Sequence, residues 1–112
     1  MDNLVEFFRV LSDKTRLRIL VLLFHKELCV CEMCEIMEET QPKISRHLAK
    51  LRDVGLVRDE RQGQWIFYYL NLDDIVMRHI IETIVGNKER YPVIQKDIQR
   101  LHSKTKWCER KN

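Results

Sequence analysis

The sequence has no apolar run that approaches the roughly 18 residues needed to cross a membrane. Its first residues, Met1 to Leu4, lack the basic and apolar regions of a signal peptide. No internal repeat and no low-complexity segment is visible. We therefore expect residues 1–112 to form a single domain that is located in the cytoplasm and has no membrane partner.

A strong excess of one charge is also lacking, since 20 Lys and Arg against 17 Asp and Glu give a formal net charge of +3. A net charge this small identifies no partner, so the distribution of the charges matters more than their sum. Residues 27–39 contain five glutamates and no basic residue, whereas residues 41–64 contain six basic and three acidic residues. A domain of this size buries a modest core, which makes a dimer plausible.

Hydrophobic periodicity predicts a fold that is mainly α with a small β-hairpin. Apolar residues recur at helical spacing over residues 4–11, in the segment that follows Asp13, and over residues 31–38, 72–85 and 91–101. Thr40 and Pro42 mark the start of a further helix that ends at Gly55. Residues 56–61 and 64–70 then read as two strands around a Gly turn. A short helix, a tight turn, a basic helix and a hairpin together indicate a winged helix-turn-helix.

The basic helix has one apolar face, because Ile44, Leu48 and Leu51 fall within about 40° of each other on a helical wheel. We expect these three residues in the core and the opposite face on DNA. Amide and hydroxyl groups can meet base edges, and basic groups can neutralise phosphates; for one residue, His47, a packing role is an equal alternative. The predicted DNA contacts are Gln41, Lys43, Ser45, Arg46, His47 and Lys50 of the helix and Arg61, Gln62, Gly63 and Gln64 of the hairpin tip.

Three cysteines, Cys29, Cys31 and Cys34, fall within six residues directly before this helix. On an ideal helix Cys31 and Cys34 lie about 60° apart on one face, whereas Cys29 points away from them. The three sulfurs can therefore meet on one ion only if Cys29 precedes the helix and folds back, or if binding unwinds the first turn. Three thiolates favour soft ions. Arsenic(III) and antimony(III), which form pyramidal three-coordinate sites, fit best, and cadmium and lead are alternatives. Zinc would need a fourth ligand such as His25, a carboxylate or Cys108.

Residues 40–48, continued by Leu51, Gly55, Leu56 and Val57, resemble the recognition helix and exit turn of the ArsR/SmtB family of winged-helix repressors. Residues 11–20 are similar to the second-helix signature of that family, and residues 27–34 resemble the arsenic-sensing motif of its arsenic-responsive (ArsR) branch. The resemblance extends over residues 4 to about 85.

The resemblance implies a repressor that binds double-stranded operator DNA as a homodimer and dissociates when As(III) or Sb(III) binds Cys29, Cys31 and Cys34. No permanent cofactor is implied. The last helix lacks the paired Asp/His and His/Glu pattern of the family's zinc site, and Cys108 has no counterpart that can be matched.

The last predicted helix carries a stripe of Tyr91, Ile94, Ile98 and Leu101, whose spacing is typical of helix-to-helix association. Together with the helix that contains Phe7 and Phe8, this stripe is our candidate for the dimer interface. We expect residues 1–11 and about 72–102 to form dimerisation helices, followed by a tail over residues 103–112.

Other interpretations of the cysteines remain open. They could be inert core residues, or Cys31 and Cys34 could be the reactive pair of a winged-helix regulator that senses thiol oxidation. A dithiol oxidoreductase is disfavoured, because the segment follows an amphipathic helix rather than a strand of a βαβ unit. No Ser/His/Asp or paired-carboxylate constellation accompanies it either. We therefore predict that the protein is not an enzyme.

Overall fold

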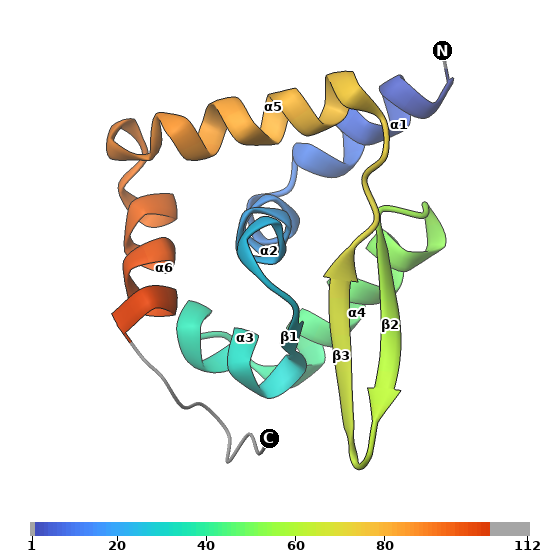
Figure 1. Cartoon of the computed structure of the whole chain (residues 1–112), viewed down its shortest axis with the longest axis vertical. Coiled ribbons are helices and arrows are strands. Elements are labelled where there is room, and N and C mark those ends of the chain that lie inside the picture. The colour runs from blue at the N-terminus through green and yellow to red at the C-terminus, as the bar shows by residue number, and fades with distance from the viewer. Residues whose placement is uncertain (1, 104–112) are drawn as a thin grey trace.

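A computed structural model of the protein describes residues 2–103 (Figure 1). Residues 104–112, with Cys108 and all of the predicted tail except Ser103, lie outside the described residues. Every predicted helix and strand is present, with boundaries that differ by a few residues. The elements are α1 (Asp2–Leu11), α2 (Lys14–His25), β1 (Leu28–Cys29), α3 (Val30–Met37), α4 (Gln41–Asp53), β2 (Val57–Gln62), β3 (Trp65–Leu70), α5 (Ile75–Gly86), a 3₁₀ turn η1 (Lys88–Arg90) and α6 (Pro92–Ser103).

Helix α2 is the centre of the fold. Its residues from Ile19 to Leu23 are all buried, as expected for a helix that is apolar around most of its circumference. Figure 1 shows α2 almost end-on, with α5, α6, α3 and the sheet arranged around it. The helix begins at a defined point, because the Asp13 carboxylate accepts a 3.0 Å hydrogen bond from the backbone N–H of Arg16.

We expect Asp13→Ala to lower the free energy of unfolding by about 1 kcal/mol at neutral pH, because it removes this cap. Burial opposes ionisation of Asp13, but the Arg16 N–H, the charge of His47 in the acid range where that ring is protonated, and the charge of Arg16 hold the pKa of the Asp13 carboxyl below the ordinary 3.8. Because the pKa of this carboxyl is lower in the folded than in the unfolded protein, its ionisation stabilises the folded protein at pH values above the unfolded pKa. This contribution is lost as the pH falls through the folded pKa.

Chemical denaturation of wild type and Asp13→Ala over a pH series measures both effects. The stability difference should narrow as the pH falls below 3.8. Asp13→Asn, which keeps a capping oxygen without the charge, is the matched control. A difference that stays constant down to the lowest pH would show that the carboxylate charge has no part in the cap.

The sheet has three antiparallel strands in the order β1-β3-β2. Strands β2 and β3 form the predicted hairpin, and Gly63 at its tip has a φ of +67°, which favours glycine. The third strand, β1, was not predicted, because two residues are too few to show an alternating pattern. It pairs Leu28 with Tyr68 and Cys29 with Phe67, so the first cysteine is attached to the wing.

Helix α4 packs as its wheel predicts, since Ile44, Leu48 and Leu51 are all buried. The interpretation of the α6 stripe needs correction. Ile94, Ile98 and Leu101 retain only 7%, 3% and 5% of their exposure within this chain, where Ile94 and Ile98 pack against α2. These three residues are therefore used inside the domain. Tyr91 alone of the stripe stays exposed, and exposed apolar side chains remain on α1 and α5.

Candidate functional site

The α4 face opposite the core carries the predicted DNA contacts. Gln41, Arg46 and Lys50 are exposed, and Ser45 is half-buried. The Gln41 amide Nε2 donates a 2.8 Å hydrogen bond to the Ser45 hydroxyl, which fixes two hydrogen-bonding groups side by side. The Lys43 Nζ lies 3.3 Å from the Glu39 carboxylate, so an ion pair holds this cation against the turn before the helix. Such a face offers both donors for base edges and cations for phosphates.

His47 is placed differently from its neighbours. Only 12% of its side chain is exposed, and its Nδ1 lies 3.9 Å from the Asp13 carboxylate at the start of α2. Burial and the surrounding arginines and lysine lower the pKa of His47 below 6.5, against the pull of Asp13. The ring is therefore neutral at neutral pH and turned towards α2, which supports the packing alternative for this residue.

The hairpin supplies the second basic segment. Arg61, Gln62, Gly63 and Gln64 are all exposed, and they lie at the far end of β2 and β3 from α5 (Figure 1). On the same hairpin, Phe67 is buried, and Trp65 and Tyr69 are half-buried. These three aromatic side chains thus pack at least partly against the domain, and the polar tip of the hairpin is accessible to a ligand.

The three cysteines are spread over the junction of β1 and α3. Cys29 ends β1 and is the N-cap residue of α3, with 3% exposure; Cys31 is exposed in the first turn of α3, and Cys34 is half-buried one turn later. Cys29 thus precedes the helix, as in the first of the two predicted arrangements. Within residues 2–103, no three His, Cys, Asp or Glu side chains are grouped so that they could hold a metal ion. A three-sulfur site therefore requires movement at this junction.

A buried glutamate holds Cys29 in place. The Glu32 carboxylate, on a residue with 2% exposure, accepts a 2.9 Å hydrogen bond from the Cys29 backbone N–H, and the Glu32 backbone N–H faces the Cys29 sulfur in return. This is a capping box with a thiol in the place of a hydroxyl. It stabilises the start of α3 with the Cys29 sulfur directed inward.

Burial is the main cause that raises the pKa of Cys29 and of Cys34 above 9.0. The Glu32 backbone N–H lowers the Cys29 value, while the Glu32 carboxylate raises it; Glu35 and Glu39 raise the pKa of Cys34 further. Both thiols are free and protonated at neutral pH. Because the thiolate is the reactive form, the raised pKa makes these two thiols less nucleophilic at neutral pH than ordinary cysteines.

The backbone of Cys34 connects the cysteine segment to the recognition helix. Its carbonyl oxygen accepts hydrogen bonds from the N–H groups of Glu38 and Glu39, the latter at 3.2 Å. Glu38 adopts a left-handed conformation with φ 57° and ψ 49°, which is unfavourable for a residue other than glycine. Hydrogen bonds to the Cys34 carbonyl thus hold the turn that leads into Thr40, the N-cap of α4.

Arginines from two other helices bind the remaining carbonyls at the end of α3. Arg100 of α6 donates to the carbonyls of Glu35 and Ile36, and Arg18 of α2 donates to that of Met37. Arg18 is fixed in turn by Asp97 of α6, a carboxylate with 2% exposure that accepts 2.7 and 2.8 Å bonds from the guanidinium. Sequence reasoning missed these residues. The available signal was an acidic residue, Asp97, directly beside Ile98 of the apolar stripe.

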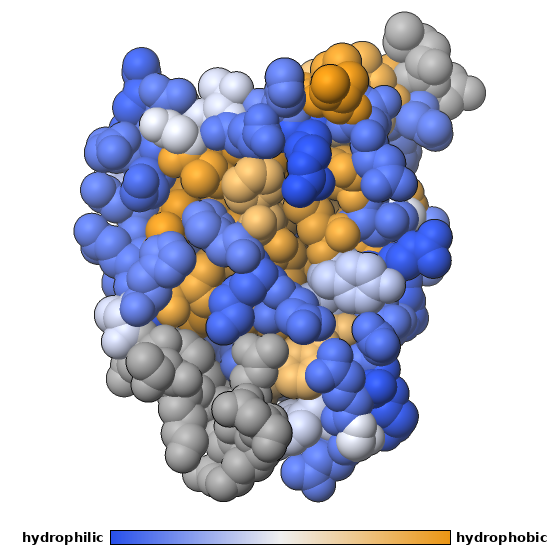
Figure 2. Space-filling view, in the orientation of Figure 1, coloured by the Kyte–Doolittle hydropathy of each residue, from blue (hydrophilic) through white to orange (hydrophobic). Residues whose placement is uncertain are grey.

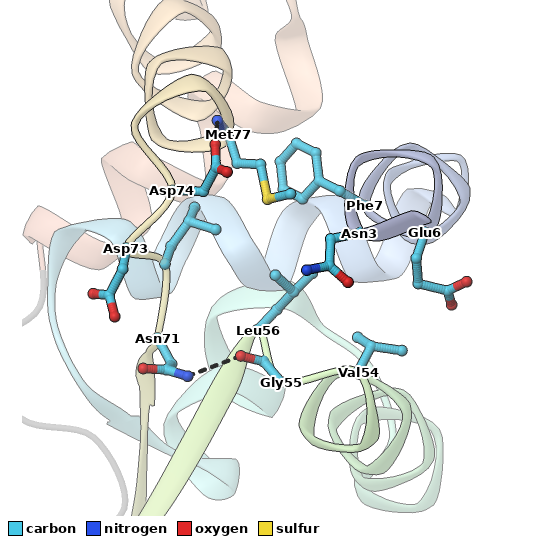
Figure 3. A pocket seen from close by; sticks show the side chains of 11 residues that line it. Asn3, Glu6, Phe7, Val54, Gly55, Leu56, Asn71, Asp73, Asp74 and Met77 are labelled. Atoms are coloured by element: carbon cyan, nitrogen blue, oxygen red, sulfur yellow. Dashed lines mark hydrogen bonds between the residues drawn. The ribbon is translucent and has the colours of Figure 1, made fainter. Parts of the chain in front are cut away.

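A pocket of about 250 Å³ lies near the exit of the recognition helix (Figure 3). The Asn71 amide donates a 2.9 Å bond to the Gly55 carbonyl there, which ties the segment before α5 to the end of α4. No cysteine lines this pocket, so it is separate from the thiol segment. Besides Asn71 and Gly55 its lining includes apolar and acidic residues: Phe7, Leu56, Met77, Glu6, Asp73 and Asp74.

Apolar side chains also remain on the outer surface. Val5 and Phe8 of α1 and Ile75 and Val76 of α5 are exposed. Figure 2 shows apolar surface at the upper edge of the molecule, where Figure 1 places the start of α5 beside α1, and also in the centre of the same face. Within residues 2–103, no helix is both long and apolar enough to cross a bilayer.

Comparison with known proteins gives relatives among transcriptional regulators. Residues 13–59, from the N-cap of α2 into β2, match the model of the bacterial regulatory protein arsR family. The chain is 50% identical to the arsenical resistance operon repressor of Escherichia coli K12 over 60% of its own length and 58% of that protein. It is 38% identical to an uncharacterized HTH-type transcriptional regulator of Methanocaldococcus jannaschii over 74% of this chain and 92% of that protein. The chain spans between 51% and 58% of the first arsenic-resistance regulators that it matches.

Solved structures agree with this assignment. Reduced HlyU from Vibrio cholerae superposes with a TM-score of 0.69 at 31% identity, over 80% of this chain and 90% of that one. The AntR antimony-specific transcriptional repressor superposes with a TM-score of 0.64 at 28% identity, over 80% of this chain and 79% of that one. These relatives are regulators rather than enzymes, and the winged helix-turn-helix fold predicted from the sequence is confirmed. Its sequence and its fold together place the chain in the ArsR family of bacterial regulatory proteins.

Proposed function

We propose that the protein is a cytoplasmic transcriptional repressor that binds operator DNA as a homodimer and leaves it when As(III) or Sb(III) binds Cys29, Cys31 and Cys34. One observation carries this proposal: the Cys34 carbonyl accepts the hydrogen bonds that close the turn before α4. A ligand that moves Cys34 therefore acts directly on the start of the recognition helix.

The names of the relatives support a thiophilic effector. One relative is an arsenical resistance operon repressor, and one structural neighbour is an antimony-specific repressor. Both elements form three-coordinate sites with sulfur, which matches the number of cysteines in the segment. Cadmium and lead remain alternatives, and zinc would need a fourth ligand.

The three-sulfur site would form by a condensation reaction in which water is the leaving group. In the reduced protein, in which the disulfide that the structure gives Cys31 is opened to a thiol, arsenous acid, As(OH)₃, condenses with the three thiols of the segment. Three As–S bonds form, and each As–OH leaves as water with one thiol proton. Cys31 and Cys34 already share one face of α3, so Cys29 has to move furthest, and closure of the three sulfurs on arsenic also pulls on Cys34. It must leave its buried position, which breaks the capping box with Glu32 and opens the first turn of α3.

We expect effector binding at the cysteines to change the affinity of α4 for DNA through the structure between them. The effector would not cover the DNA-binding surface itself. A coupling of about 1–3 kcal/mol corresponds to a roughly 5- to 150-fold change in operator affinity. The deformation of α3 would pass through Glu38 and Glu39 to Thr40, and so alter the angle at which α4 enters the major groove. The same deformation occurs in both subunits of a symmetric dimer.

On DNA, α4 would lie in the major groove and the hairpin tip against the backbone. Gln41 and Ser45 would meet base edges, and Lys43, Arg46 and Lys50 would contact phosphates or guanines. The exposed apolar side chains of α1 and α5 form the surface proposed for the dimer: Val5, Phe8, Ile75 and Val76. The two recognition helices would then read the two halves of an inverted repeat.

We expect Arg46→Ala to weaken operator binding and to lower the slope of log affinity against log salt by about 0.9, the value for one phosphate contact. Fluorescence anisotropy at several salt concentrations measures the slope. Lys88→Ala is the charge-matched control, because η1 lies far from α4 and the wing (Figure 1). An Arg46→Ala protein with unchanged affinity and slope would exclude Arg46 from the interface.

The proposal is tested by selecting a binding site from random DNA and titrating the reduced protein–DNA complex with arsenite, with zinc as the control ion. Release near one equivalent of arsenite per chain is the expected result. A complex that ignores arsenite but dissociates on peroxide treatment would instead identify a regulator of the thiol-oxidation type.

A further inference from the structure

The C-terminal end of α3 is bound by groups that lie outside the helix. The last four carbonyls of any α-helix lack partners within the helix. In α3 these belong to Cys34, Glu35, Ile36 and Met37, and each one has a partner. Arginine side chains from α2 and α6 bind three of them, and the turn towards α4 binds the fourth, that of Cys34.

The arginine contacts are short and come from fixed positions. Arg100 donates from Nη2 to the Glu35 carbonyl at 2.6 Å and from Nε to the Ile36 carbonyl at 2.8 Å. Arg18 donates to the Met37 carbonyl at 3.1 Å while it makes a two-point contact with the buried Asp97. Charged donors make stronger hydrogen bonds than neutral ones. The end of α3 is thus fixed to α2 and α6 by three hydrogen bonds.

The same cations bind the acidic turn. Arg100 lies 3.7 Å from the Glu38 carboxylate, and Arg18 lies 3.8 Å from that of Glu39. Glu38 is the residue in the left-handed conformation, so an ion pair helps to hold an unfavourable backbone geometry. Carbonyls before the turn and carboxylates within it are therefore bound by two guanidinium groups.

We propose that Arg100 and Arg18 are positioning residues for the response to the effector, and that α6, which lies outside the family match, is the support against which α3 deforms. If the end of α3 is fixed, a pull on Cys34 changes the hydrogen bonds of the turn and moves Thr40. If the end of α3 is released, α3 shifts as a whole and the turn before α4 keeps its shape. This inference rests on the proposed function, because it concerns how the same cysteine segment acts on α4.

The variant Arg100→Met tests it, because methionine keeps an apolar side chain but cannot donate to the Glu35 and Ile36 carbonyls. The measured quantity is the ratio of operator affinities without and with arsenite. We expect this ratio to fall roughly 2- to 30-fold relative to wild type, the range for residues that transmit coupling between sites. Arsenite affinity of the DNA-free protein and circular dichroism are measured in parallel, since a merely structural defect would alter these and leave the ratio unchanged.

Lys96→Met is the matched control. Lys96 also lies near the Glu38 carboxylate, at 3.9 Å, but no carbonyl of α3 accepts a hydrogen bond from it among the described contacts. Its ratio should stay at the wild-type value. An equal loss in Lys96→Met, or an unchanged ratio in folded Arg100→Met, would overturn the inference. If Arg100→Met does not fold, Arg100→Lys, which keeps the charge but not the fork of two donors, decides the question in the same way. Failure of the proposed function is recognised separately, because wild type would then show no arsenite-dependent ratio at all.

Discussion

A Cys31→Ser protein should bind operator DNA as tightly as wild type and keep it when arsenite is added. Cys31 is exposed in the first turn of α3, so the substitution removes a sulfur without opening a cavity. With two sulfurs left, the three-coordinate site cannot close and the capping box of Cys29 and Glu32 is not broken. The roughly 5- to 150-fold loss of affinity expected for wild type should therefore disappear. Anisotropy of labelled operator DNA under reducing conditions measures it.

Cys108→Ser serves as the control for the removal of a cysteine that the proposal does not use as a ligand. It should release DNA on arsenite addition as wild type does. Release that persists in Cys31→Ser would contradict the three-cysteine site, and loss of release in Cys108→Ser would show that the ligand set has been assigned incorrectly.

The second large effect concerns stability. Arg18→Met removes the partner of a buried carboxylate, since Asp97 retains 2% exposure and makes both of its short contacts with Arg18. Removal of one member of a buried ion pair costs about 3–5 kcal/mol, because the other charge stays buried without its partner. We expect a loss of this size in the free energy of unfolding, measured by chemical denaturation at a fixed protein concentration.

The double variant Arg18→Met/Asp97→Leu separates this cause from simple loss of packing. Replacement of both charges with apolar groups removes the stranded carboxylate, so the double variant should recover most of the stability that Arg18→Met loses. Additive losses in the two single variants and the double variant would show that the two side chains contribute independently.

Most of the fold could be predicted because its signals are local. The apolar spacing of Ile44, Leu48 and Leu51 defined α4 and its buried face, and Asp13 and Thr40 marked where α2 and α4 begin. The cysteines, too, could be recognised as a set from their spacing alone. Periodicity and capping depend on neighbours within one or two helical turns, so they are readable without knowledge of the tertiary contacts.

The remaining features depend on contacts between distant parts of the chain. Arg18 and Asp97 are 79 residues apart, and Arg100 lies 64 residues from Ile36. No periodic pattern records such pairs. The same limitation explains the error on the α6 stripe, because its spacing shows that a partner helix exists but not whether that helix, here α2, belongs to the same chain.

The central claim is that three sulfurs of one chain bind the metalloid. X-ray absorption at the arsenic edge of the arsenite-loaded, reduced protein tests it most directly, because it counts the atoms bound to arsenic. Arsenic should have three sulfur neighbours in wild type, and two sulfurs with one oxygen in Cys29→Ser. Two sulfurs and an oxygen in wild type, or an unchanged spectrum in Cys29→Ser, would contradict it.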